Sequence, residues 1–108
     1  MPTLANSIIT AVNNLGTTPI VVMQPSPTRT SINFHAPGSV DIIVAPLTVL
    51  QGGVSVNLVP SLAALGGCYR VYANGGDRPI SGPAAGQGWQ AFAVSGSNQP
   101  LTITEGYS

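Results

Sequence analysis

Few residues of this chain could carry out acid–base chemistry. The sequence contains one histidine, His35, and three carboxylates, at Asp41, Asp77 and Glu105. A hydrolytic triad could combine His35 and Asp41 with a serine, and a hydrogen bond between the two is conceivable, but no Gly-x-Ser-x-Gly elbow is present. Position alone supplies neither a nucleophile nor an oxyanion site. We therefore expect polar surface or interface roles for both residues, and a protein that is not an enzyme.

Metal and cofactor sites are no better supported. A zinc site needs three or four Cys, His or carboxylate ligands, whereas His35 and Cys68 are the only residues of their kinds. Asn74 and Asp77 could offer oxygens to calcium, but Asn-Gly-Gly-Asp is typical of a turn. The glycines at 82, 86 and 88 do not lead from a strand into a helix, so they predict no phosphate cradle. We expect no metal and no cofactor, and a buried thiol at Cys68.

The charge content points away from nucleic acid and toward an assembly. Charged residues make up 6% of the 108 positions, against about 25% in a typical domain, and the formal net charge is zero. There is no lysine, and three arginines give no basic footprint for nucleic acid. No apolar stretch is long enough for a transmembrane helix, and no basic signal region opens the chain. A neutral surface favours association, so we expect a subunit made in a cytoplasm that works inside an assembly.

The stretch from Arg29 to Pro46 organises the predicted fold. Ile32, Phe34 and Ala36 alternate with polar residues, which predicts a strand with one apolar face. Val40, Ile42 and Val44 alternate in the same way after Pro37-Gly38, and Pro46 ends the run. We interpret the stretch as two strands paired in a hairpin around a tight turn.

Other short apolar or alternating runs, separated by Gly, Pro, Asn and Ser, predict further strands. They lie near 20–23, 47–50, 54–58, 68–73, 78–81, 89–94 and 101–105. About eight short strands at this spacing indicate an all-β fold, a single antiparallel β-sandwich that is jelly-roll-like. Residues 1–16 are expected to form a short helix or an extended arm, although Ser7–Val12 could also pair as a strand. Residues 17–108 form the predicted sandwich domain.

Five residues are the predicted interface candidates. In a chain so poor in charge, Arg29 and Arg70 each need a specific partner, either an internal carboxylate such as Asp41 or Glu105 or an acidic group on a neighbouring subunit. Aromatic residues fill cores or interfaces more often than they form a sugar-binding platform. The five candidates are Arg29, His35, Arg70, Tyr72 and Trp89.

The pattern Arg-x-x-Ile-x-Phe-x-x-x-Gly-x-x-Asp-Ile-x-Val-x-Pro at Arg29–Pro46 resembles a motif of small virion proteins of tailed bacteriophages. The run Gly88–Gly96, followed by Leu101–Glu105, is similar to the closing pair of strands in those proteins. The resemblance covers about residues 17–107 and rests on pattern alone.

The resemblance implies a capsid decoration, or cement, protein. Such a protein would be a non-enzymatic homo-oligomer, here expected to be a homotrimer, that binds the major capsid protein on the virion surface. The alternatives are another virion component, in the neck, tail or fibre base, and a carbohydrate-binding β-sandwich module. The last alternative predicts Trp89 or the tyrosines exposed on one flat face.

Overall fold

The computed structural model describes residues 7–107, which form ten strands and one short 3-10 helix. In chain order, the elements are β1 (Ser7–Leu15), β2 (Ile20–Met23), β3 (Arg29–Ala36), β4 (Ile42–Pro46), β5 (Thr48–Gln51), β6 (Val54–Asn57), β7 (Tyr69–Val71), β8 (Gly76–Ser81), η1 (Gly82–Gly86), β9 (Trp89–Ala93) and β10 (Gln99–Tyr107).

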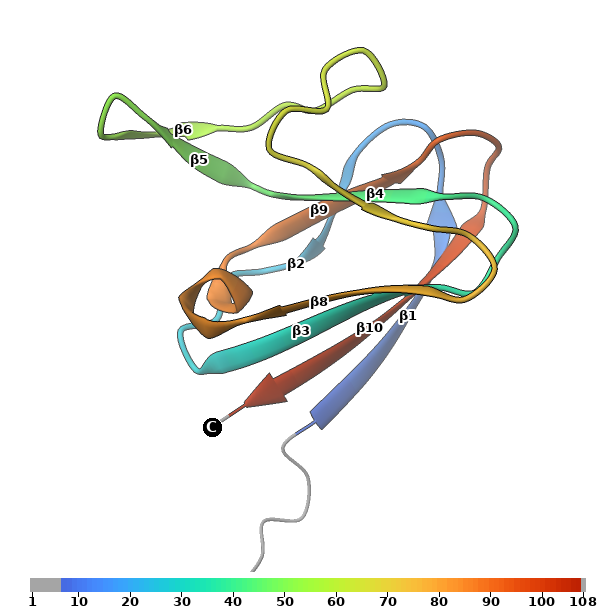
Figure 1. The fold of residues 1–108 in the computed structure, drawn as a ribbon, viewed down its shortest axis with the longest axis horizontal. Helices are drawn as coiled ribbons and strands as arrows, with labels where there is room; N and C mark the ends of the chain where they lie inside the picture. Colours follow the sequence, from blue (N-terminus) through green and yellow to red (C-terminus); the bar gives the residue numbers. More distant parts are fainter. Residues whose placement is uncertain (1–6, 108) are drawn as a thin grey trace, which may run out of the picture.

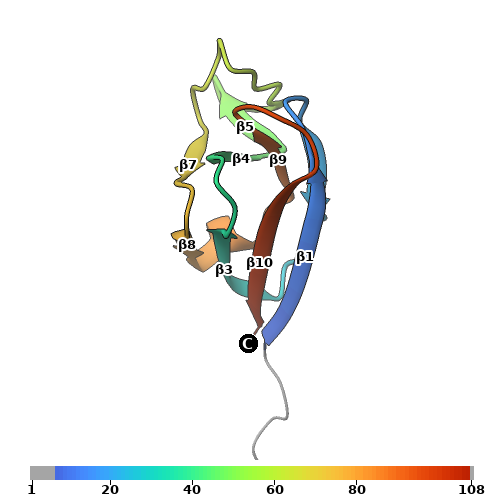
Figure 2. The same cartoon turned by 90° about the vertical axis from the view of Figure 1, so that its right-hand side faces the viewer.

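Eight of these strands form two antiparallel sheets that pack face to face (Figures 1 and 2). Sheet A has the order β1-β10-β3-β8, and sheet B has the order β2-β9-β4-β7. With β5 and β6 set aside, the eight strands follow the order of a jelly roll. Successive strands alternate between the two sheets, except that β4 and β7 pair with each other in sheet B. The expected all-β, jelly-roll-like sandwich is confirmed.

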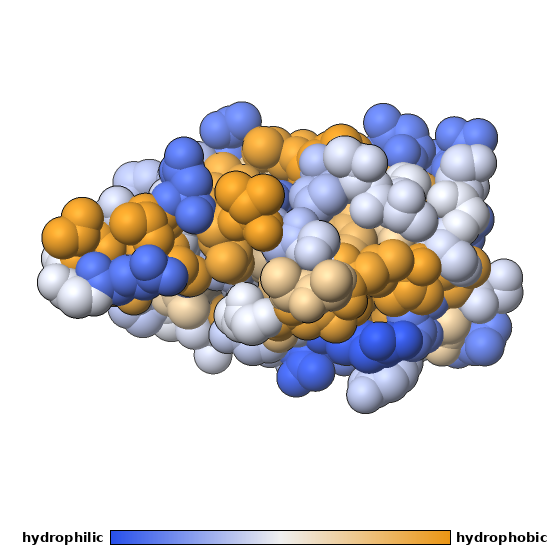
Figure 3. Space-filling model, turned by 90° about the horizontal axis from the view of Figure 1, so that it is seen from above, coloured by the Kyte–Doolittle hydropathy of each residue, from blue (hydrophilic) through white to orange (hydrophobic). Residues whose placement is uncertain are grey.

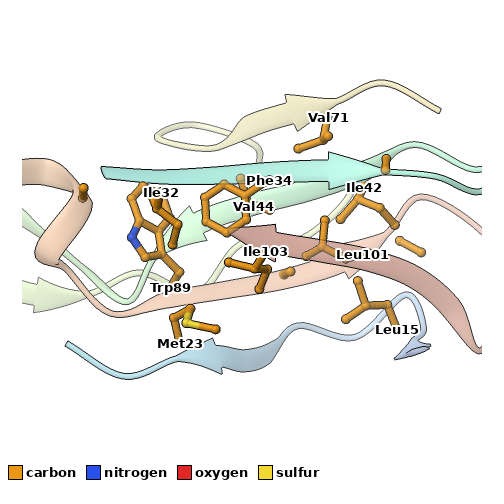
Figure 4. Close-up of a cluster of buried hydrophobic side chains, with 14 residues drawn as sticks. Leu15, Met23, Ile32, Phe34, Ile42, Val44, Val71, Trp89, Leu101 and Ile103 are labelled. Atoms are coloured by element: carbon orange, nitrogen blue, oxygen red, sulfur yellow. The ribbon is translucent and has the colours of Figure 1, made fainter. Parts of the chain in front are cut away.

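The core lies between the two sheets and is built by strand alternation. Ile32 and Phe34 of β3 point inward from sheet A, and Ile42 and Val44 of β4 point inward from sheet B. Trp89 lies among them, with its ring edge-to-face against Phe34 at 5.3 Å between centroids (Figure 4). Because each aromatic ring buries a large apolar area, this pair anchors the packing of the two sheets.

The predicted hairpin between β3 and β4 is wrong. β3 pairs with β10 and β8 in sheet A, whereas β4 pairs with β9 and β7 in sheet B. The segment around Pro37-Gly38 therefore crosses from one sheet to the other instead of closing a hairpin. Alternating apolar residues predict a strand and its inward face, but two strands that face each other across a core have the same pattern as two neighbours in one sheet.

Of the alternatives left open for residues 1–16, the short helix is wrong over the residues that the structure describes, and the paired strand is the one that forms. Ser7–Leu15 is a strand that pairs antiparallel with β10, from Ser7 opposite Gly106 to Leu15 opposite Gln99. Its β-branched residues favour a strand, and β10 supplies the hydrogen-bonding partner that the local sequence cannot reveal. Residues 1–6 of the expected N-terminal segment lie outside the described residues.

A two-stranded hairpin interrupts the jelly roll between β4 and β7. Strands β5 and β6 pair only with each other among the described strands, and they extend beyond the two main sheets (Figure 1). We call residues 47–67, which comprise this hairpin and the loop that follows it, the arm. Within that loop, Ser61 and Ala64 form an isolated β-bridge.

Candidate interaction surface

The arm begins at a fixed base on the sandwich. Gln90 of β9 donates two hydrogen bonds through its side-chain nitrogen, to the carbonyl oxygens of Pro46 at 3.1 Å and Leu58 at 2.8 Å. The backbone N–H of Leu47 donates to the carbonyl oxygen of Gly88 at 3.0 Å. Because Gln90 is itself buried, these bonds hold both ends of the hairpin against sheet B.

The tip of the arm is a tight turn that requires glycine. Gln51 pairs with Val54, so Gly52 and Gly53 are the two central residues of the hairpin turn. Both have positive φ angles, of 58° and 81°, as the primed turns of two-residue hairpins require at one or both positions. An ideal Cβ at either glycine would meet no atom within 4 Å, so the tip projects into open space.

The surface of the arm is apolar and uncharged. Leu50 is 75% exposed and Val59 is 82% exposed, and Val54, Leu62 and Leu65 are also exposed. No charged residue occurs between Asp41 and Arg70 in the sequence. In Figure 3, apolar side chains gather at the end of the molecule from which the arm extends. A two-stranded hairpin is marginally stable by itself in water, so this surface is suited to packing against another molecule.

A polar cluster lies at β7, where the chain returns from the arm. Arg70 donates to Asp41 at 2.7 Å, and the guanidinium carbon lies 5.8 Å from the centre of the Tyr72 ring. The backbone N–H of Ala73 donates to the other Asp41 oxygen at 2.7 Å. That backbone bond and the Arg70 side chain lower the pKa of Asp41. Arg70 and Tyr72 are both exposed, so two of the predicted interface candidates lie together on the surface.

His35 contacts an acidic residue, but this residue is Asp77 and not Asp41. Its Nδ1 lies 2.9 Å from Asp77 on β8, and Asn33 donates to the same carboxylate oxygen at 2.9 Å. The Asn33 bond, followed by the His35 bond, lowers the pKa of Asp77. The considered hydrogen bond from His35 to Asp41 is not formed, because His35 contacts Asp77, whereas Asp41 lies just before β4 and accepts from Arg70 and Ala73. No serine, threonine or cysteine side chain is hydrogen-bonded to this exposed group among the described residues.

Arg29 and Trp89 lie inside the domain and not on its surface. Arg29 is 4% exposed and donates to Glu105 at 3.0 Å, so the internal carboxylate is the partner that the structure shows. Trp89 is 1% exposed, and its ring is in the core. Neither side chain is therefore available to a partner. Trp89 cannot contribute to the considered sugar-binding platform, whereas Tyr69 and Tyr72 are exposed. The sequence around Trp89 does not distinguish a buried tryptophan from an exposed one.

Two other surface features are candidates for a site, a hollow on sheet A and the thiol of Cys68. The hollow on sheet A, of about 390 Å³, is lined by small polar residues, including Ser31 and Thr104, and by apolar residues that include Pro79 and Ile80. Cys68 is only partly buried, contrary to expectation, and this partial burial raises the pKa of its thiol.

Within residues 7–107, no three His, Cys, Asp or Glu side chains come close enough together to hold a metal ion. In the same range, no helix is long and apolar enough to cross a membrane.

The sequence matches no protein-family model and no curated protein. Several solved structures, including the three that follow, are distantly similar to this chain. A chain of the Bacillus endospore appendages, described as disulfide-linked pili, is 8% identical, with 100% of this chain and 96% of that chain covered and a TM-score of 0.48. A dTDP-4-dehydrorhamnose 3,5-epimerase from Bacillus anthracis is 9% identical, covers 96% of this chain, and has a TM-score of 0.49.

The third similar structure is a de novo designed double-stranded β-helix, which is 13% identical, covers 96% of this chain and all of the other, and has a TM-score of 0.33. This chain spans about half of the epimerase, since 53% of that chain is covered. Similarities at this level of sequence identity and TM-score assign no function to this chain.

Proposed function

We propose that this protein is a non-enzymatic structural subunit that works by packing against other protein subunits. The observation that carries the proposal is the arm, an uncharged hairpin with exposed apolar side chains on a fixed base. Burying this surface removes apolar area from water without stripping water from a charge, so docking has little electrostatic cost. The low charge of the whole chain extends the same property to the remaining surface.

Within this class, we propose a virion protein, most specifically a capsid decoration protein that binds the major capsid protein on the outside of the shell. The resemblance of Arg29–Pro46 and Leu101–Glu105 to small phage virion proteins supports this assignment. Jelly rolls are common among viral capsid domains, although the fold also serves lectins and enzymes. The proposal includes self-association, and the resemblance to phage decoration proteins implies a homotrimer.

A position in the neck, tail or fibre base is the second candidate, because the arm could dock onto any neighbouring virion subunit. The carbohydrate-binding module is less well supported, since Trp89 is buried and only Tyr69 and Tyr72 of the aromatic residues considered are exposed. The number and location of copies on the particle distinguish the two virion positions. Electron microscopy of labelled particles would show a decoration protein over the whole shell and a neck or tail protein at one vertex.

The proposal can be tested by co-sedimentation with empty shells of a candidate major capsid protein. We expect the wild-type protein to pellet with the shells, and the double variant Leu50→Ser/Val59→Ser to bind at least tenfold more weakly, because it loses two of the most exposed apolar side chains of the arm. The matched control is Val21→Ser, which changes a 52% exposed residue of β2 in sheet B and should leave binding intact. Absence of wild-type binding to shells and to complete particles, from a protein that is also monomeric, would overturn the proposal.

A further inference from the structure

The two edges of sheet A differ in how well they are protected against pairing with another strand. Strand β8 at one edge carries Asp77, Arg78 and Pro79 in succession. Charged side chains and proline are the usual means by which an edge strand is kept from pairing with a second chain. Strand β1 at the other edge has nine residues with no charge and no proline. Only one of the two edges is therefore blocked.

Strand β1 also exposes apolar side chains beside its free edge. Ile9 is 72% exposed and Ile8 is 52% exposed. The strand pairs regularly with β10 from Ser7 to Val12, and a register shift occurs only between Val12 and Leu15. Within residues 7–107, β10 is the only strand that pairs with β1, so alternate N–H and C=O groups along its outer side lack a strand partner. This geometry is complementary to another extended strand.

We propose that β1 pairs antiparallel with β1 of a second copy of this chain, so that two copies of sheet A form one continuous sheet. A second copy fits because the edge is complementary to itself in the antiparallel direction, and a chain of zero net charge is not repelled by its own copy. The two-fold axis is perpendicular to the sheet. Directly opposed residues of an antiparallel pair share a face, so Ile9 lies beside outer-face residues of the other β1.

The inference goes beyond the proposed function, because it concerns contact between copies and not docking by the arm. A two-fold contact produces oligomers with an even number of chains. Two chains form if this is the only contact, and six form if a trimer forms through a separate surface. The mass of the protein in solution therefore tests the edge contact independently of any capsid.

Sedimentation equilibrium with the full chain, over about 1 to 500 µM, provides the first measurement. We expect a dimer or hexamer for the wild type and at least tenfold weaker pairing for Ile9→Lys, because a lysine at an edge opposes strand addition. Leu50→Lys is the control, since it adds the same charge at a similarly exposed position on the arm and should leave pairing unchanged. A strictly monomeric or trimeric wild type, or unchanged pairing of Ile9→Lys, would overturn the inference.

Cysteine cross-linking keeps the test valid if Ile9→Lys folds poorly. In a Cys68→Ser background, at least one of Ile9→Cys, Ala11→Cys and the double variant Ile9→Cys/Ala11→Cys should form an intermolecular disulfide on mild oxidation. A residue lies opposite its own copy only where the two-fold axis passes through it, and the double variant covers an axis at residue 10, where position 9 lies opposite position 11 of the second copy. Ser97→Cys, in the exposed turn before β10, should not form such a disulfide. If Ile9→Lys abolishes shell binding while the wild type alone is monomeric, the edge pairs with the shell protein, and the second-copy proposal is wrong.

Discussion

The buried ion pair between Arg29 and Glu105 gives the sharpest prediction about stability. The exposed fractions of the two side chains are 3% and 7%. Besides Glu105, Arg29 donates to three backbone carbonyls, those of Gln24, Ala85 and Gln87, at 2.9 to 3.0 Å. The same guanidinium therefore joins the loop after β2, the short helix η1 and strand β10. The change Arg29→Met removes all of these donors while keeping much of the side-chain volume.

The expected cost follows from what the change leaves behind. Glu105 would remain buried with the Tyr107 hydroxyl as its one hydrogen-bond donor among the described residues. Removing one partner of a buried ion pair costs about 3–5 kcal/mol. A domain of this size has a total stability of about 5–15 kcal/mol, and each kcal/mol lowers Tm by about 4–8 °C. We therefore expect Arg29→Met to lower Tm by about 12–40 °C and to remove about a fifth or more of the total stability.

Urea denaturation of a double-mutant cycle measures the pair directly. The double variant Arg29→Met/Glu105→Gln should recover about 2 kcal/mol or more relative to the sum of the single variants, since no uncompensated charge is left. Arg29→Lys should be intermediate, because an ammonium group keeps the charge but cannot reach all of the guanidinium's acceptors. A loss below about 1 kcal/mol for Arg29→Met, or single costs that simply add, would refute the structural role that we assign to this pair.

Two further predictions concern the turn before β8 and the response to acid. Gly76→Ala should lower the free energy of unfolding clearly in urea titrations, because the new Cβ would overlap the backbone carbonyl of Tyr72, whereas Gly66→Ala, which meets no atom within 4 Å, should have little effect. The pKa of Asp41 is lower in the folded state, so its contribution to stability is present above the ordinary value of about 3.9 and is lost as the pH falls through the folded-state pKa. The stability of Asp41→Asn should therefore fall less between pH 5 and pH 2 than that of the wild type, and equal slopes would show that Asp41 is not held by Ala73 and Arg70.

The strands could be predicted from the sequence, whereas their pairing could not. The run at Ile20–Met23 and the alternation in Val54–Asn57 each gave a strand that the structure contains. Alternation also predicted the inward face of β3 correctly. It could not show that β3 and β4 belong to different sheets, because facing strands and paired strands bury the same alternate side chains. Strand β1 was ambiguous for a related reason, since its partner β10 lies at the far end of the sequence.

The candidate surface was predicted only in part. The scarcity of charge indicated that each arginine has a specific partner, and Glu105 and Asp41 are both internal carboxylates that had been considered. Burial of Arg29 and Trp89 could not be inferred, because composition does not show which arginine or aromatic residue faces the core. The arm was predicted as two strands and a turn, but its separation from both sheets is a property of the fold. The absence of charge between Asp41 and Arg70 was the available signal that pointed to it.

Hydrogen exchange of the arm tests most directly whether this protein works by packing against other subunits. In the free chain, the amides of β5 and β6 should exchange quickly, because a two-stranded hairpin without a packing partner opens readily. With shells of the major capsid protein present, we expect exchange in residues 48–57 to slow at least tenfold, while the amides of β3 and β9 in the core change little. Exchange in the arm that is the same with and without shells would contradict the account.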